Sequence, residues 1–172
     1  MSTRPPMIRH WREIQWPDDE HYPGSRELVS IRSSFGHAFG LQRIAVNLDV
    51  LPPGRRSSWP HAHSDEEECV FVVDGAPDVL IDGVLHRLQA GDAVGFPAGS
   101  GIAHTFINNS ATDVLLLVVG ERGRSGDKLH YPLHPCRNAD IRDSHWRNAP
   151  TVVHGPHDGR PDALRANPVD PD

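Results

Sequence analysis

The sequence lacks the features that define several large classes of protein. It has only two cysteines among 172 residues, Cys69 and Cys136, so it cannot build the disulfide framework of a small secreted domain or a zinc site made of thiolates alone. Its longest apolar run, residues 114–119, is far shorter than the roughly 20 residues of a membrane-spanning helix. Prolines occupy the N-terminal region where a signal peptide would carry its apolar core. We therefore expect a cytoplasmic protein that contacts no membrane.

Basic charge is also scarce. The chain has 17 Lys and Arg against 23 Asp and Glu, a formal net charge of -6, and Arg55-Arg56 is its only adjacent basic pair. A protein that binds nucleic acid needs a patch of basic side chains to neutralise phosphates. The sequence therefore predicts no nucleic-acid partner and favours a small molecule as the ligand.

Short apolar runs separated by turn residues fill the middle of the chain. Runs typical of strands span residues 28–32, 41–51, 68–73, 79–81, 84–88, 93–96, 103–108 and 113–119. Asp82-Gly83 separates two of these runs and favours a two-residue type I′ hairpin, a turn that needs positive φ at both positions. No amphipathic helical pattern alternates with the strands, so the sequence predicts an all-β barrel or sandwich over residues 27–131.

The two ends of the chain differ from this middle part. Residues 1–26 are interrupted by prolines and carry Trp11 and Trp16, and we expect them to form an N-terminal arm. Residues 132–172 are rich in proline, histidine and charge, which predicts an extended, irregular C-terminal tail. Because an open barrel exposes sheet edges and two-fold dimers are the commonest assembly, we expect a homodimer in which these ends pack against the partner.

Histidine is abundant, with 12 residues, and two segments place it in strand-like positions. His61 and His63 are two residues apart and therefore point to the same side of a strand. Glu68 follows a Ser64-Asp65 turn that resets the register, so that it faces the same interior. His104 begins an alternating strand after a Pro/Gly turn. Three imidazoles and one carboxylate on interior faces predict a site for a divalent first-row transition metal such as Zn, Mn, Fe or Ni.

Further residues of these strands are candidates for the wall of the same pocket: Arg43, Asn47, Phe96, Phe106 and Asn108. Arg43 and Asn47 are in phase on one predicted strand and could hold the polar end of a substrate, although a surface position is favoured over a substrate contact. Phenylalanines such as Phe96 and Phe106 are more often barrel core than substrate contacts, and the favoured role of Asn108 is to secure a turn or a backbone group, with a substrate contact as the alternative. The sequence identifies no catalytic base, although four residues qualify if the fold brings them to the pocket: Glu66, Glu67, His86 and Tyr131.

Together the two segments resemble the two sequence motifs of the cupin superfamily. The first motif runs Gly, His-x-His, Glu, Gly, and is matched by Gly54, His61, His63, Glu68 and Gly75. The second runs Gly, Pro-x-Gly, His, Asn, and is matched by Gly91, Pro97, Gly99, His104 and Asn108. The first motif has one extra residue before His61, and the second has a longer loop before His104. Residues 96–110 further resemble small single-domain bacterial cupins, some of which are described as sugar-phosphate isomerase-like.

The resemblance implies a double-stranded β-helix, which is the cupin jelly-roll barrel, with the metal held by the four residues named above. Four ligands on an octahedral ion leave two adjacent positions for a chelating substrate. This geometry predicts a metal-dependent isomerase or lyase acting on a small polar carbonyl, hydroxy-acid or sugar-type compound. An Fe(II)-dependent dioxygenase or a non-catalytic metal-dependent binding module would use the same ligands, and the sequence does not separate these alternatives.

Overall fold

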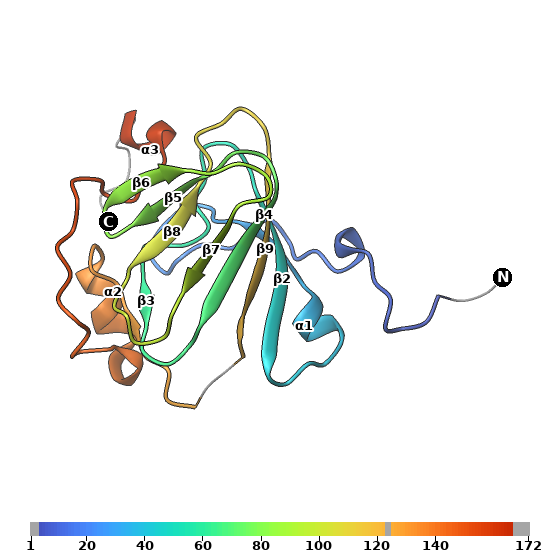
Figure 1. Ribbon diagram of the computed structural model, residues 1–172, viewed down its shortest axis with the longest axis horizontal. Helices are drawn as coiled ribbons and strands as arrows, with labels where there is room; N and C mark the ends of the chain where they lie inside the picture. The colour runs from blue at the N-terminus through green and yellow to red at the C-terminus, as the bar shows by residue number, and fades with distance from the viewer. Residues whose placement is uncertain (1–3, 123–124, 167–172) are drawn as a thin grey trace.

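A computed structural model describes residues 4–122 and 125–166 of the chain (Figure 1). Its strands are β1 (Ile31–Ser34), β2 (Ile44–Leu51), β3 (Ala62–His63), β4 (Glu68–Asp74), β5 (Asp78–Ile81), β6 (Val84–Arg87), β7 (Ala93–Phe96), β8 (His104–Ile107), β9 (Val114–Glu121) and β10 (Leu129–His130). Its helices are short: η1 (Trp11–Glu13), α1 (Phe35–Ala38), α2 (Pro135–Asp140), η2 (Arg142–Ser144) and α3 (Asp162–Ala166).

The strands form an antiparallel barrel. One sheet has the order β1-β2-β9-β4-β7 and a second has the order β6-β5-β8, while β10 pairs with β3 at one end. A core of buried side chains joins the two larger sheets: Leu51, Val70, Val72, Val79, Phe96, Phe106, Val114 and Leu116. The all-β prediction of a double-stranded β-helix is therefore confirmed.

The alternation along β4 shows how the sequence produces this barrel. Val70 and Val72 are 1% and 0% exposed, whereas Cys69, Phe71 and Val73 between and beside them are exposed. Successive side chains of a strand point to opposite faces, so alternate residues supply the core and burying them stabilises it. As the first motif predicted, Glu68 is in phase with the buried valines.

The β5–β6 hairpin has the predicted turn. Asp82 and Gly83 have φ angles of 47° and 79°, the left-handed conformation at both positions that a type I′ turn requires. Gly83 also lets the C-terminal segment pass close by, because a Cβ at this position would collide with the backbone of Gly155. One dipeptide thus closes the hairpin and makes room for the tail.

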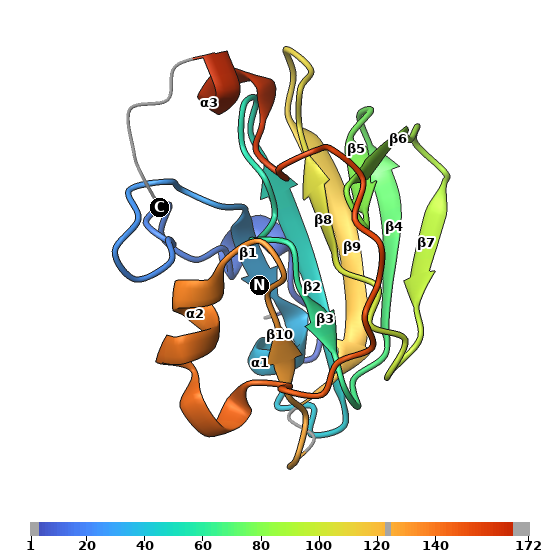
Figure 2. The same cartoon turned by 90° about the vertical axis from the view of Figure 1, so that its left-hand side faces the viewer.

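The terminal segments extend from this barrel and wrap it. The N-terminal arm projects away from the barrel at its start (Figure 1) and joins β1 further along, where the Trp16 amide donates to the Arg32 carbonyl at 2.8 Å. The C-terminal segment runs along one side of the barrel and contains α2 and α3, short helices that no periodicity in the sequence predicts (Figure 2). Residues 1–3 of the expected arm and 167–172 of the expected tail lie outside the described residues. Within the described ranges, no helix has the length and apolar character needed to cross a bilayer.

A buried arginine binds the C-terminal segment and Glu27, the residue that directly follows the N-terminal arm. Arg56 is 0% exposed, and its Nε and Nη2 donate to the Glu27 carboxylate at 2.7 and 2.6 Å. Its Nη1 donates to the Gly159 carbonyl in the C-terminal segment at 3.0 Å. A buried guanidinium needs such partners because leaving it unpaired costs several kcal/mol, on the order of 3–5.

Candidate metal centre

The four predicted ligands come together at the end of the barrel where β3 meets β8. A bridge joins His61 and His104, whose backbone amides donate to each other's carbonyls at 3.3 and 3.1 Å. The His61 ring centroid lies 5.0 Å from that of His63 and 5.4 Å from that of His104. His104 Nε2 lies 3.2 Å from Glu68 Oε1, which brings the carboxylate of β4 to the histidine of β8 in the other large sheet.

Each of the three imidazoles has its Nδ1 held by an oxygen atom. The Nδ1 atoms of His61, His63 and His104 lie 2.8 Å from the Trp59 carbonyl, 2.7 Å from Asp127 Oδ2 and 3.3 Å from the Ile102 carbonyl. A carbonyl or an ionised carboxylate only accepts, so Nδ1 of His61 and of His63 donates and their Nε2 keeps its lone pair, whereas Nε2 of His104 is itself within hydrogen-bond distance of Glu68 Oε1. Histidines that bind metals show this arrangement, with the outer N–H fixed by an oxygen of the protein.

The charge states of the site suit a cation. Burial lowers the pKa of His61 to about 3, and neighbouring His104 and His63 act in the same direction. Burial alone would raise the pKa of Glu68, but the hydrogen bond with His104 and the charges of the histidines lower it to about 2. At neutral pH His61 is therefore neutral and Glu68 ionised, the forms in which both side chains bind a metal.

Aromatic rings fix the planes of two of these imidazoles. The Phe96 ring stacks on His104 with centroids 3.4 Å apart and an interplanar angle of 5°. Tyr131 lies against His61 with centroids 5.5 Å apart. Phe96 thus backs His104 and does not line the main cavity, in contrast to its predicted place in the pocket wall.

The four residues line a cavity of about 340 Å³, a size that suits a small molecule. Asn47 and Phe106 line it, as the sequence predicted. Arg43 does not: it is exposed and borders a separate hollow with Gln42 and Asp65. The physical reason is that β2 begins at Ile44, one residue after Arg43, so the strand phase that placed Arg43 beside Asn47 does not apply.

Asn108 also lies outside the lining of this cavity. It is 0% exposed, and its amide nitrogen donates to the carbonyls of Leu51 and Thr112 at 2.7 and 2.8 Å. Its carbonyl oxygen accepts from the amide of Ser110 at 2.9 Å. Asn108 therefore secures the turn after β8, the alternative to a substrate contact.

The four candidate bases lie in different places relative to the cavity, and only one of them lines it. Glu66 lines the cavity, and burial raises the pKa of its carboxyl. Tyr131 lines an adjoining cavity of about 310 Å³, which also touches His61. Glu67 faces a hollow on the outer side of the five-stranded sheet, and His86 is exposed on β6.

Several residues of the site carry no signal in the sequence motifs. Arg32, Asp49, Ser57 and Ser58 line the cavity, and Asp127 holds His63 from 64 residues further along the chain. His63, Glu66 and Asp127 bring three ligand atoms within 4.8 Å of one another. Because His63 Nδ1 already donates to Asp127, we interpret this group as the support of His63.

Comparison with known proteins agrees with this geometry. Residues 47–120 match the family model of the cupin domain. This segment is a cupin domain. A search of curated proteins finds no match.

Solved structures include similar cupins. A sugar phosphate isomerase of the cupin superfamily from Silicibacter pomeroyi is 35% identical with a TM-score of 0.57, and the match covers 59% of this chain and 64% of that one. A candidate sugar phosphate isomerase from Acidithiobacillus ferrooxidans is 32% identical with a TM-score of 0.57, and the match covers 60% and 65%. The matches thus span less than two thirds of either neighbour. The polyketide cyclase RemF from Streptomyces resistomycificus, 20% identical with a TM-score of 0.57 over 74% of this chain and 84% of its own, shares the fold.

Proposed function

We propose that this cupin holds a divalent first-row transition metal at His61, His63, Glu68 and His104. We further propose that it is an isomerase or lyase for a small polar carbonyl, hydroxy-acid or sugar-type compound. The observation that carries the proposal is the convergence of three imidazoles and one carboxylate: the held Nδ1 atoms of His61 and His63 leave their Nε2 lone pairs for a cation, and Nε2 of His104 lies beside the Glu68 carboxylate, where a cation would take the place of the shared proton. The donor set of three imidazoles and one carboxylate suits Zn, Mn, Fe or Ni.

A bound metal would supply a Lewis acid that polarises a carbonyl or hydroxyl oxygen of the substrate. The protein would supply the proton transfer: Glu66 lines the cavity, and burial raises the pKa of its carboxyl, which makes the carboxylate a stronger base than an exposed one. Val70, Phe106 and Leu116 give the cavity an apolar wall that limits water. The names of the two sugar phosphate isomerases favour a sugar-type substrate.

The metal assignment is tested by replacing His104 with alanine and His86 with alanine as the matched control. Both variants lose one imidazole, but only His104 is at the site, whereas His86 is exposed on β6. We expect His104→Ala to lose most of its metal by elemental analysis and His86→Ala to keep the wild-type stoichiometry. Equal metal content in the two variants would refute the assignment.

The reaction class is tested with Glu66→Gln and with oxygen. In assays of sugars, sugar phosphates and hydroxy acids, we expect Glu66→Gln to keep its metal and to lose about 100-fold or more in turnover, the usual share of a general base. Turnover that requires air would favour an Fe(II)-dependent dioxygenase instead. Ligand binding with no product under air or nitrogen would favour a non-catalytic binding module.

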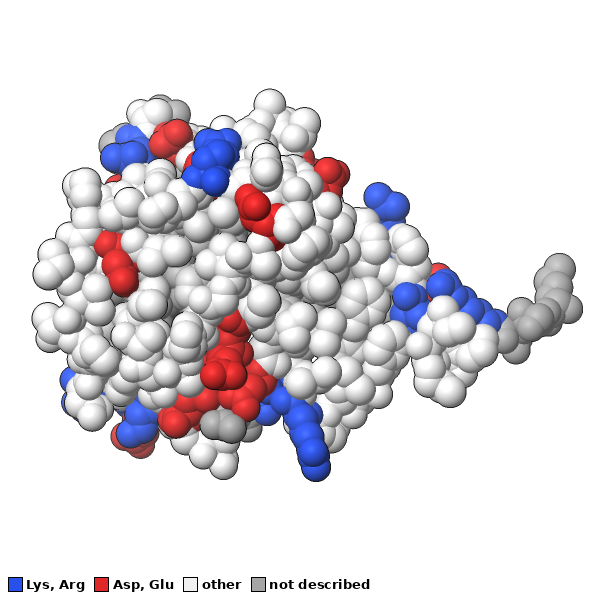
Figure 3. Space-filling model, viewed as in Figure 1, with Lys and Arg blue, Asp and Glu red and all other residues white. Residues whose placement is uncertain are grey.

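We also propose that the protein is a homodimer that pairs through the outer face of the five-stranded sheet. Phe71 and Val73 on β4 are 40% and 43% exposed. Phe71 pairs across the sheet with Leu117, and Cys69 pairs with Val119, which extends this uncharged face onto β9. The side of the molecule where β4 and β7 lie in front shows a broad uncharged surface above a group of acidic side chains (Figure 3).

A second copy of the chain suits this face because a two-fold contact sets the same patch against itself, and an uncharged patch brings no like charges together near the two-fold axis. A stable dimer buries about 800 Å² per partner. The arm, in which Met7 is 74% exposed, would add to the area of the sheet. We expect Phe71→Glu to give monomers in light scattering and Val84→Glu, a matched change on β6, to leave dimers; a monomeric wild type would contradict the proposal.

A further inference from the structure

Arg32 is a charged side chain at the cavity whose role lies outside the motifs. It lies on β1, opposite Asp49 on β2, and both residues line the cavity of the metal centre. Arg32 Nε donates to Asp49 Oδ1 at 3.2 Å, and Nη2 donates to Oδ2 at 3.3 Å. Asp49 is 1% exposed and also accepts from the Ser30 hydroxyl at 2.9 Å. The buried carboxylate therefore fixes one edge of the guanidinium.

The other edge of the same guanidinium is left for a ligand. Nη1 of Arg32 has no hydrogen-bond acceptor within residues 4–122 and 125–166. The side chain is 35% exposed, although Asp49 beneath it is almost fully buried. Arg32, Ser57, Ser58 and His61 line both the 340 Å³ cavity and the adjoining 310 Å³ cavity, so Arg32 lies where the two meet.

A second polar group faces the same space. Asn47 follows the phase of Asp49 on β2 and lines the larger cavity. Its side chain makes no hydrogen bond with the described part of the chain, although the residue is only 9% exposed. A nearly buried amide without a protein partner is uncommon, because such groups normally find one. Arg32 and Asn47 thus offer N–H donors on the wall that also carries the metal ligands.

We propose that Arg32, presented by Asp49, binds an oxyanion of the molecule whose other end reaches the metal centre. The inference rests on the proposed function and narrows its substrate class: a hydroxy acid or hydroxy carbonyl compound that carries a carboxylate or phosphate group at its far end. A guanidinium suits this task because its planar donors match the oxygens of both groups. Asn47 would donate a further hydrogen bond.

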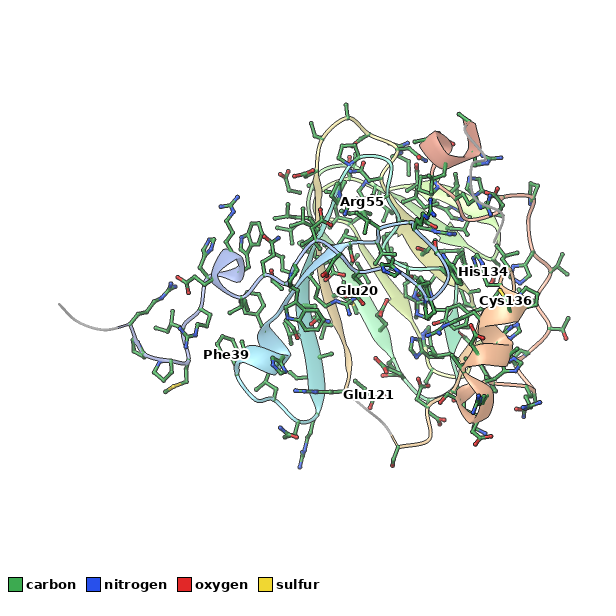
Figure 4. The ribbon with its side chains drawn as sticks, turned by 180° about the vertical axis from the view of Figure 1, so that it is seen from behind. Glu20, Phe39, Arg55, Glu121, His134 and Cys136 are labelled. Carbon is green, nitrogen blue, oxygen red and sulfur yellow. The ribbon has the colours of Figure 1, made fainter. Side chains whose placement is uncertain are left out.

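Other charges around Arg32 limit this attraction. The charge of Asp49, and more weakly those of Glu20 and Glu68, raises the pKa of Arg32, so it stays charged. Glu20 lies on the arm over the middle of the barrel and lines the smaller cavity, where it competes for the guanidinium (Figure 4). A metal at the site would offset the charge of Glu68 and leave the larger cavity more receptive to an anion.

The test compares probes that differ only at the far end. L-malate and 2-hydroxybutanoate share the hydroxy-acid group, but malate ends in a carboxylate and 2-hydroxybutanoate in a methyl group; 3-phosphoglycerate ends in a phosphate. With the cobalt(II)-loaded protein, we expect malate or 3-phosphoglycerate to bind about tenfold more tightly than 2-hydroxybutanoate, as calorimetry and the cobalt spectrum would show. Whichever probe has the preference identifies carboxylate or phosphate as the recognised group.

Variants then assign the preference to Arg32. We expect Arg32→Met to bind malate or 3-phosphoglycerate no more tightly than 2-hydroxybutanoate, while 2-hydroxybutanoate still binds. Arg43→Met is an equal loss of charge outside the cavity, and we expect it to keep the wild-type ratio of these affinities. The double variant Arg32→Met/Asp49→Asn leaves no buried carboxylate unpaired and serves if the single variant does not fold. A wild-type ratio near one, or a preference that survives in the Arg32 variants, would show that the arginine only joins β1 to β2.

A metal-free measurement separates this inference from the proposed function. Inorganic phosphate is titrated into the metal-free protein while the side-chain N–H resonance of Arg32 is followed by NMR. A shift with phosphate in a protein that binds no cobalt would overturn the metal assignment and keep the oxyanion site. A protein that binds cobalt, but shows no preference for probes with a terminal carboxylate or phosphate and no shift with inorganic phosphate, would keep the metal assignment and overturn the oxyanion site.

Discussion

The barrel strands and the terminal segments contribute to one site in different ways. The strands supply the candidate metal ligands: β3, β4 and β8, with His61 just before β3, bring three imidazoles and a carboxylate together. The terminal segments supply the surroundings. Trp59 lies between Tyr22 of the arm and His134 of the tail, stacked on rings at 4.2 and 4.0 Å.

The difference shows that an irregular sequence can still fold into a specific structure. The strands are held by ladder hydrogen bonds and an apolar core, whereas the terminal segments are held by a few polar and aromatic contacts such as the Arg56 cluster. In Figure 4, His134 lies on the side where the C-terminal segment packs. If this division is correct, single replacements in the terminal segments affect stability, while replacements around the histidines affect the metal.

The largest expected effect breaks the Arg56 cluster. Glu27→Ala leaves a guanidinium that is 0% exposed without its carboxylate, so we expect the free energy of unfolding to fall by about 3–5 kcal/mol in urea. Asp18→Ala is the control, because it removes an exposed ion pair with Arg55 that is worth at most about 1 kcal/mol. Similar losses in the two variants would show that the cluster does not anchor the terminal segments.

Acid titration of the metal-free protein tests the charge states of His61 and Glu68, which belong to the part of the site that the strands build. The pKa of His61 is about 3 in the folded protein against 6.5 in the unfolded chain, so the unfolded chain binds protons first as the pH falls. The contribution of His61 to the free energy of unfolding is therefore fully present above pH 6.5 and is lost towards pH 3. The free energy of unfolding falls by on the order of 3 kcal/mol by about pH 4. Glu68, lowered from 4.5 to about 2, adds to the loss below pH 4.5.

Denaturant unfolding at each pH measures this loss, and His61→Asn serves as the control. We expect the free energy of unfolding of the variant to lose the His61 share of its fall between about pH 6.5 and pH 4.5, where Glu68 contributes little. A wild type whose stability does not change over this interval would contradict the buried, neutral state of His61.

A smaller effect is expected where the two regions meet. Asp127→Asn replaces the carboxylate that accepts from His63 Nδ1 at 2.7 Å, so the imidazole loses its fixed orientation and some basicity. We expect metal affinity to fall by about 10–100-fold, the usual effect of losing such an outer partner. Competition with a chelator measures it, and Asp143→Asn in η2 is a control that leaves affinity unchanged. An unchanged affinity in Asp127→Asn would mean that His63 needs no support.

The smallest effect concerns the aromatic stack. His134→Ala removes the ring that lies 4.0 Å from Trp59, and we expect a loss of about 1 kcal/mol in unfolding free energy without a change in metal affinity. Tryptophan fluorescence during urea unfolding provides the measurement. A loss of metal binding in this variant would show that the tail acts on the centre directly.

Much of the barrel could be predicted because its signals are local. The run of residues 93–96 matches β7, and Asp82-Gly83 forms the predicted turn, since alternation and turn chemistry act over a few residues. Boundaries were less accurate: the run predicted at 28–32 became β1 at Ile31–Ser34, and the error at the start of β2 misplaced Arg43. The two-residue strands β3 and β10 are too short to show a period.

The candidate ligands could also be predicted, since two-residue spacing and turn positions place His61, His63, Glu68 and His104 on interior faces. Their partners could not, because each comes from a distant part of the chain. Asp127 reaches His63 across 64 residues, and Arg56 binds Gly159 across 103. No periodicity relates residues so far apart, so only the folded chain identifies them.

The sequence by itself determined the class of fold, the strand phase and the residue types at the candidate metal centre, because these follow from the periodicity of a strand and the chemistry of side chains. Only the tertiary structure decided which oxygens hold the imidazoles, that Arg32 rather than Arg43 faces the cavity, and how the two ends pack. Those outcomes depend on distances between remote segments, which backbone pairing and burial set together once the barrel closes.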